Sequence, residues 1–172
     1  MIRRAVNTED EAESLTRIHI DAWKWAYRGI LPDHYLQGLD QEYERRLHVW
    51  RRVLGADVAR SAVWVADEGD EAVGFASTGP SRAEGAPPTE AELYSIYLLE
   101  RVAGTGVGNA LFTAANDEMR KQGYLIATLW VAEANLRARR FYAREGWTPD
   151  GGRMVEHMAG FDLVEVRYRV SL

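Results

Sequence analysis

The apolar residues of the chain recur at two different spacings, and these spacings predict a mixture of strands and helices. Alternating or continuous apolar runs, rich in β-branched and aromatic residues, predict strands at 2–6, 61–66, 72–78, 92–99, 126–131, 153–157 and 164–170. Apolar residues three and four apart predict helices at 8–26, 40–54, 107–121 and 135–145. Thr8 and Glu11 form a capping box at the start of the first helix.

Four large aromatic residues lie close together near the end of the first predicted helix. They are Trp23, Trp25, Tyr27 and Tyr35, and they surround Gly29 and Pro32. Large aromatic residues most often serve packing, so a place in the hydrophobic core is the plain interpretation. The alternative is that they form the wall of a substrate pocket.

The segment 92–121 combines a strand, a glycine-rich loop and a helix. Gly104, Gly106 and Gly108 fall within five residues, directly after the predicted strand and at the start of the predicted helix. The first turn of a helix has four N–H groups without partners and a partial positive charge. Because glycine lets the backbone approach a phosphate and adopt positive φ, the segment predicts an anion-binding cradle.

Two common nucleotide-binding loops do not fit this spacing. A dinucleotide loop, G-x-G-x-x-G, needs a third glycine, but Asn109 is the sixth residue from Gly104 and Leu111 the sixth from Gly106. An NTPase loop needs a Lys followed by Ser or Thr, which this segment lacks. A nucleotide ligand is therefore disfavoured. If the loop did bind a nucleotide, ATP or NAD would stabilise the protein against thermal unfolding and coenzyme A would not.

The loop resembles that of the GNAT superfamily, the acetyl-CoA-dependent N-acetyltransferases, which reads (Gln or Arg)-x-x-Gly-x-(Gly or Ala) after a strand. The pattern falls on Ala103, Gly104, Thr105, Gly106, Val107 and Gly108. The glycines match, whereas Ala103 replaces the leading polar residue, and nearby Arg101 is expected to supply the missing charge. Glu100 is a second departure, because many relatives have proline there.

A second segment, 135–147, is similar to a later motif of the same superfamily, N-x-x-A-x-x-F-Y-x-x-x-G-(F or W). All its positions match: Asn135, Ala138, Phe141, Tyr142, Gly146 and Trp147. The resemblance implies that Asn135 hydrogen-bonds the pantetheine arm of acetyl-CoA and that Tyr142 lies near the sulfur. It also implies that residues 103–109, ending at Asn109, bind the pyrophosphate.

The resemblance implies a mixed α/β fold with the order β-α-α-β-β-β-α-β-α-β-β. Its sheet is mostly antiparallel, has six to seven strands with splayed central strands, and is flanked by about four helices. The length of 172 residues and the 47% hydrophobic content suit one domain over 1–172. Within it, 1–90 is expected to form the acceptor side and 91–172 the acetyl-CoA side, and the family analogy suggests a homodimer.

Composition and net charge argue against several kinds of partner and ligand. The net charge of −5 and the pI of about 5.4 argue against nucleic acid and anionic membranes, and mildly favour a cationic substrate. The absence of cysteine excludes disulfides and an acyl-cysteine intermediate. The four histidines show no metal-ligand spacing, so no metal site is expected. No apolar run reaches membrane-spanning length, and the cytoplasm is the expected location.

The implied reaction transfers the acetyl group of acetyl-CoA, as co-substrate, to a primary amine. An alkylammonium group has a pKa of about 10.4, so it must lose a proton before it attacks. Glu92, at the head of the central strand, is the predicted base. The resemblance also places a backbone N–H at Leu98, where the strand is expected to bulge, next to the thioester oxygen. Tyr142 is the predicted acid for the leaving thiolate.

The acceptor is expected to be a small-molecule or peptide amine, and its identity stays open. Trp23, Tyr27, Tyr35 and Glu92 are the residues predicted to contact it. The competing class of protein is a regulatory module that binds acyl-CoA without turnover, for which Ala103 and Glu100 are the only indications.

Overall fold

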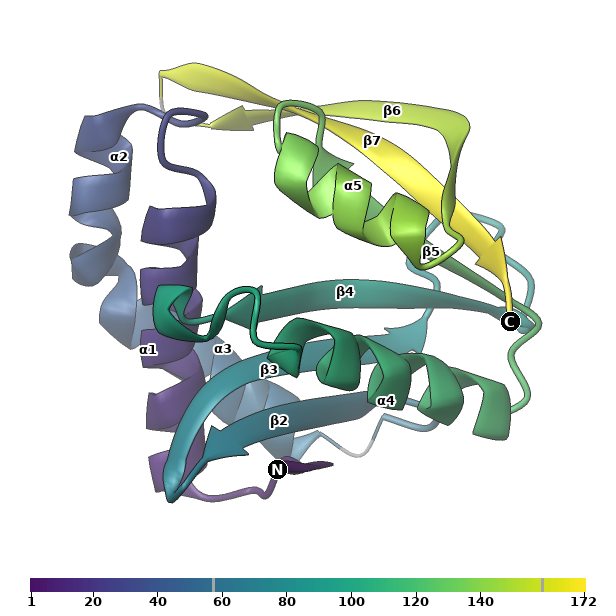
Figure 1. Cartoon of the computed structure of the whole chain (residues 1–172), viewed down its shortest axis with the longest axis horizontal. Coiled ribbons are helices and arrows are strands. Elements are labelled where there is room, and N and C mark those ends of the chain that lie inside the picture. Colours follow the sequence, from purple (N-terminus) through teal and green to yellow (C-terminus); the bar gives the residue numbers. More distant parts are fainter. Residues whose placement is uncertain (57, 159) are drawn as a thin grey trace.

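The computed structural model describes residues 1–56, 58–158 and 160–172, which form a seven-stranded sheet with helices on both faces (Figure 1). The strands are β1 Ile2–Arg4, β2 Ala62–Glu68, β3 Glu71–Pro80, β4 Glu90–Leu98, β5 Ile126–Ala132, β6 Thr148–Met158 and β7 Phe161–Ser171. The α-helices are α1 Glu9–Ala26, α2 Asp33–Gly38, α3 Tyr43–Gly55, α4 Val107–Lys121 and α5 Leu136–Arg144, with short 3-10 helices at Leu39–Glu42 and Glu100–Val102.

The sheet has the strand order β1-β2-β3-β4-β5-β7-β6, and all neighbouring strands are antiparallel except β4 and β5. These two central strands pair over only three positions, from Glu90 opposite Ile126 to Glu92 opposite Thr128. Beyond Glu92 they separate, and each continues along its outer neighbour alone. The predicted fold, a mostly antiparallel mixed sheet with splayed central strands, is confirmed.

The bulge in β4 lies where the two central strands separate. Ser77 of β3 pairs with Ser95 and Thr78 pairs with Leu93, which leaves Tyr94 as the extra residue in β4. A bulge bends its strand and increases the local twist, so Tyr94 helps to turn β4 away from β5. The predicted bulge at Leu98 is wrong, because Leu98 pairs in regular register with Gly74.

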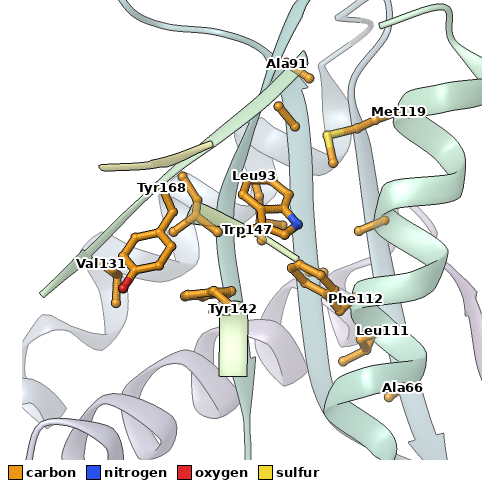
Figure 2. Close-up of a cluster of buried hydrophobic side chains, with 14 of the residues drawn as sticks. Ala66, Ala91, Leu93, Leu111, Phe112, Met119, Val131, Tyr142, Trp147 and Tyr168 are labelled. Atoms are coloured by element: carbon orange, nitrogen blue, oxygen red, sulfur yellow. The ribbon is translucent and has the colours of Figure 1, made fainter. Parts of the chain in front are cut away.

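The helices α4 and α5 lie on one face of the sheet and bury the largest core cluster (Figures 1 and 2). Phe112 projects from α4 toward Trp147 and toward Tyr142 of α5, with ring centroids 5.6 and 5.9 Å apart. Tyr168 of β7 packs against the other side of Tyr142 at 6.2 Å. Tyr142 is therefore held in place by aromatic rings on two sides.

The helices α1 and α3 cover the opposite face over the first half of the sheet. Leu15 and Ile18 of α1 and Trp50 of α3 are buried with Phe75 of β3, in line with the apolar stripe predicted for the first helix. A separate cluster joins the end of α1 and α2 to β5 and β7, and it includes Tyr27 and Leu163. This cluster anchors the α1–α2 connection over the far end of the sheet.

Several elements differ from the prediction, and three of these differences have a local structural cause. Helix α2 is absent from the prediction, because a six-residue helix after Pro32 is too short to show apolar periodicity. A 3-10 helix occupies Leu39–Glu42, so α3 begins at Tyr43 instead of residue 40. Strand β6 begins at Thr148 instead of 153, because its register is interrupted before Arg153 and the alternation is lost there.

The capping box is only half formed. Thr8 Oγ1 accepts a hydrogen bond from the Glu11 N–H at 3.3 Å, as predicted. The Glu11 carboxylate instead accepts from the Val6 N–H at 3.1 Å and from Arg3, and thereby ties the helix to β1.

Candidate active site

A cleft of about 600 Å³ opens where β4 and β5 separate. Its walls come from β4, the glycine loop and the first turn of α4 on one side, and from β5 and α5 on the other. The end of α1 closes it with Trp25 and Tyr27. The cleft therefore lies between the two motifs that the sequence analysis singled out.

The glycine loop presents open backbone to this cleft. Gly104 and Gly106 have positive φ values of 78° and 94°, and a Cβ on either would meet nothing within 4 Å. Gly106 is also the N-cap of α4, where no side chain within the described residues caps the helix. Since the first turn contains no acidic residue either, its N–H groups and partial positive charge are available to an anion.

Most of the predicted loop residues line the cleft. They are Ala103, Gly104, Gly106, Gly108 and Asn109. Thr105 does not, and its hydroxyl donates to the Val102 carbonyl at 2.8 Å, so it closes the loop from within. Val107 likewise lies outside the lining.

The positive charge at the cleft comes from α5. Arg101, expected to replace the missing polar residue at 103, pairs with Glu68 at 3.0 Å and with Glu71 at 2.7 Å and is held at the β2–β3 turn. Arg137, Arg140 and Arg144 line the cleft instead. Their spacing of three and four residues puts them on one helix face, a signal present in the sequence that the motif comparison overlooked.

Asn135 caps α5 at the edge of the cleft. Its Oδ1 accepts a hydrogen bond from the Ala138 N–H at 3.1 Å, and the residue is only 8% exposed. This bond fixes the amide plane and leaves Nδ2 as the end able to donate to a ligand.

Tyr142 lines the same cleft from α5 and is 8% exposed. Burial, and then the neighbouring Tyr97, raise the pKa of its phenol. The phenol is therefore protonated at neutral pH and can donate a hydrogen bond.

Of the three aromatic residues predicted to contact the acceptor, the structure brings only Tyr27 to the cleft. The Trp23 ring packs on Tyr27 at 4.7 Å, outside the lining. Tyr35 packs edge-on against Phe161 of β7 at 5.0 Å. Trp25, which the sequence analysis noted but did not select, does line the cleft, and the Arg137 guanidinium lies 3.5 Å from its ring centroid.

Glu92 is buried, with 3% exposure, and its carboxylate is bound by Arg82. The Arg82 backbone N–H donates to Oε2 at 3.0 Å, Nε lies 3.2 Å from both oxygens, and Nη2 contacts Oε1. The next residue, Leu93, is the first residue of β4 that lines the cleft. Glu92 thus lies beside the cleft in a fully formed ion pair.

The backbone of β4 supplies donors to the cleft beyond the point of separation. The Leu99 N–H donates to the Val73 carbonyl at 2.9 Å, toward β3. Successive N–H groups of a strand point to opposite sides, so the Leu98 N–H points away from β3, toward the cleft that Leu98 lines.

Among the residues that the structure describes, no group of three His, Asp or Glu side chains could hold a metal ion. Within the same residues, no helix is both long enough and apolar enough to cross a membrane.

Comparisons with known proteins agree with this geometry. The acetyltransferase (GNAT) family matches residues 17–147. The N-acetyltransferase YuaI of Bacillus subtilis is 33% identical over 129 residues, which cover 73% of this chain and 69% of YuaI. The spermidine N(1)-acetyltransferase of Thermoplasma acidophilum is 24% identical over 162 residues, covering 94% of this chain and 92% of that protein.

The fold also matches a solved structure, the PaiA N-acetyltransferase of Thermoplasma acidophilum in complex with coenzyme A. Its TM-score is 0.70 at 23% identity, and the match covers 100% of this chain and 98% of that one. The family match spans both the glycine loop and the 135–147 motif. The chain therefore belongs to the GNAT family of acetyltransferases.

Proposed function

We propose that this protein transfers the acetyl group of acetyl-CoA to a primary amine by direct attack, with both substrates bound in the one domain. The observation that carries the proposal is the uncapped start of α4 at Gly106, which faces a cleft that passes between the separated strands β4 and β5. The start of α4 would bind the phosphates of a long thioester such as acetyl-CoA, and the gap between β4 and β5 would hold the rest of the molecule.

The residues present fit coenzyme A. The backbone of residues 103–109 would bind its diphosphate, and Arg137, Arg140 and Arg144 would add positive charge where Ala103 supplies none. Asn135 Nδ2 would donate to the pantetheine arm. When bound, the co-substrate supplies an activated acetyl group.

The chain's own groups would then act on the reacting atoms. The Leu98 N–H would donate to the thioester oxygen as charge develops there, an interaction worth about 3 kcal/mol in comparable sites. The Tyr142 phenol, kept protonated by its raised pKa, would donate to the departing sulfur. Since a thiol has a pKa of about 8.5, this proton helps departure but is not essential.

Glu92 is the base predicted from the sequence. Because Arg82 binds both of its oxygens, Glu92 would take a proton through a water molecule or after this ion pair opens. Its burial beside Leu93, the first residue of β4 in the cleft lining, supports a place for it next to the acceptor.

The acceptor class we favour is a cationic amine, either a small molecule or a peptide. The net charge of −5 supports it, and one relative is named a spermidine N(1)-acetyltransferase. Tyr27 would contact this amine directly, with Trp23 packed on the Tyr27 ring and Tyr35 packed on Phe161 in the same cluster.

The test is thiol release from acetyl-CoA with a panel of amines, including spermidine and an N-terminal peptide. Turnover on an amine, reduced at least tenfold in Glu92→Gln and to a smaller extent in Tyr142→Phe, is the expected result. Tight binding of coenzyme A without turnover on any amine would instead favour the regulatory module, and thermal stabilisation by ATP or NAD alone would favour a nucleotide site.

A further inference from the structure

A second carboxylate, Glu165 on β7, lies on the acceptor side of the sheet. It is opposite Ala132, the last residue of β5, and opposite Met154 of β6. Leu163, two residues earlier and so on the same face, is buried with Tyr27 and Ala132. Glu165 therefore faces the side that carries Tyr27, away from α4 and α5.

Among the described residues Glu165 has no cationic partner, like Glu156 of β6 but unlike three other acidic residues in this part of the sheet. Glu92 pairs with Arg82, Glu90 with Arg169 at 3.7 Å, and Asp150 with Arg167 at 2.8 Å. Within residues 1–56, 58–158 and 160–172, no ion pair or hydrogen bond involves the Glu165 carboxylate, although the residue is half-buried. Its oxygens are thus free to accept from a ligand.

Glu165 lies next to the cleft without lining it, because its partner Ala132 follows Val131 and packs with Tyr27, and both Val131 and Tyr27 line the cleft. Burial raises its pKa above the usual 4.5, the charges of Glu156 and Glu92 raise it further, and Arg82 lowers it. The pKa of Tyr27 is raised mainly by burial and by neighbouring Tyr97, and the charge of Glu165 raises it further. It also raises that of Tyr97, which lines the cleft.

Tyr97 links this carboxylate to the predicted position of the sulfur. Tyr97 of β4 and Tyr142 of α5 both line the cleft, and Tyr97 raises the pKa of Tyr142. The two tyrosines come from opposite faces of the sheet. A substrate that reaches the cleft from the Glu165 side would therefore meet the thioester from the side opposite the pyrophosphate cradle.

From this geometry we infer that Glu165 is the carboxylate that binds the ammonium group of the acceptor and takes its proton. The inference rests on the proposed function and moves the role of base from Glu92 to Glu165. The ammonium N–H gives its proton to a Glu165 oxygen, and the freed lone pair of the nitrogen forms the N–C bond to the acetyl carbon. The C–S bond breaks with its electron pair on sulfur. Tyr142 gives its proton to that sulfur, the second proton of the nitrogen restores the Tyr142 phenol, and Glu165 returns its proton to solvent.

In this arrangement Glu92 and Arg82 act as a fixed pair. An ion-paired carboxylate that already accepts several hydrogen bonds has little capacity for a further proton. A half-buried carboxylate without a cation, by contrast, is both a stronger base and a better partner for an incoming ammonium group.

The test compares Glu165→Gln, Glu165→Asp and Glu92→Gln, with Glu9→Gln as a matched control that also removes one negative charge. Glu9 pairs with Arg51 at the start of α1. For the best amine of the panel, Glu165→Gln should lower kcat/KM about 100-fold and raise the KM for the amine, with the Kd for coenzyme A unchanged by calorimetry. Glu165→Asp should recover part of the loss, and Glu9→Gln should behave as the wild type. Glu92→Gln breaks the ion pair with Arg82, so it should also lower kcat/KM, but less than Glu165→Gln does.

The pH profile separates a proton acceptor from a merely structural residue. In the wild type, kcat/KM should fall as the pH drops through the raised pKa of Glu165, and this acidic limb should be absent in Glu165→Gln. The groups facing Glu165 that also shape the limb are Glu156, Glu92, Arg82, Tyr27 and Tyr97.

Wild-type kcat/KM and an unchanged pH profile in Glu165→Gln would overturn the inference and leave the proposed function intact. If the wild type turns over no amine, spermidine binding to the complex with coenzyme A is measured instead. At least tenfold weaker binding by Glu165→Gln would support the role of Glu165, whereas equal binding, or no binding by the wild type, would refute it. Unchanged far-UV circular dichroism and thermal unfolding establish that the variant is folded.

Discussion

Asn135 caps α5 and is proposed to bind coenzyme A, and replacing it with serine or alanine should separate these two roles. Its Oδ1 caps α5 through the Ala138 N–H at 3.1 Å, whereas its Nδ2 is proposed to donate to the pantetheine arm. Alanine removes both interactions. Serine keeps an oxygen that can cap the helix, but it has no amide to reach a ligand.

The expected magnitudes follow from these two bonds. Loss of an N-cap costs about 1 kcal/mol, which lowers the Tm of a chain of this size by about 2–4 °C. Loss of one neutral hydrogen bond to the ligand costs about 1 kcal/mol, which is about a fivefold increase in the Kd for coenzyme A. Asn135→Ala should show both losses, and Asn135→Ser only the second.

Thermal unfolding of the free proteins and calorimetry with coenzyme A measure the two losses separately. If both variants bind coenzyme A as tightly as the wild type, Nδ2 does not contact the cofactor. If Asn135→Ser is destabilised as much as Asn135→Ala, the cap does not account for the stability change.

Three further substitutions test other parts of the site. Gly106→Ala places a side chain at φ 94°, so it should lose about 1–2 kcal/mol of stability and bind coenzyme A more weakly; an unchanged Tm would contradict the strain. Arg101→Ala should change the Kd for coenzyme A less than twofold, because its ion pairs lie at the β2–β3 turn, and a large loss of affinity would return Arg101 to the cofactor site. Burial, with Arg46 and Arg45, lowers the pKa of His19 from 6.5 to about 3. Below pH 6.5 the unfolded chain therefore binds a proton that the folded chain excludes, and the free energy of unfolding should fall by about 2 kcal/mol at pH 5. Urea unfolding between pH 7 and pH 5 should show a weaker pH dependence in His19→Gln than in the wild type. An equal pH dependence in both proteins would refute the assignment to His19.

The parts of the site built from local chain geometry could be predicted from the sequence. The glycine loop and the start of α4 depend on positive φ and an uncapped first turn, and both follow from Gly104 and Gly106. The full match of residues 135–147 likewise placed Asn135 and Tyr142 on one wall of the cleft.

The parts that depend on contacts between distant segments could not be predicted. Arg101 is closer in sequence to the loop than any α5 arginine, yet Glu68 and Glu71 bind it elsewhere. The alternation of apolar and polar residues in the last strand predicted one solvent-exposed face, but it could not show that Glu165 lies on the side of the sheet that carries Tyr27. That depends on the position of β7, which lies between β5 and β6 in the sheet although it follows both of them in the chain.

Leu98 connects the proposed pyrophosphate-binding loop to the proposed donor for the thioester oxygen. A Cβ on Gly108 of α4 would lie 2.9 Å from Leu98 Cδ1, and a Cβ on Gly74 of β3 would lie 2.4 Å from Leu98 Cδ2. Two glycines on different elements thus leave space for one leucine side chain, while the N–H of the same residue points into the cleft. Because the interior is close-packed, the start of α4 cannot shift along β4 without displacing Leu98. The distance between the phosphate end and the reacting end of the cleft is therefore set by packing, and this rigidity suits a site that must hold a long, flexible thioester with its carbonyl at one fixed point.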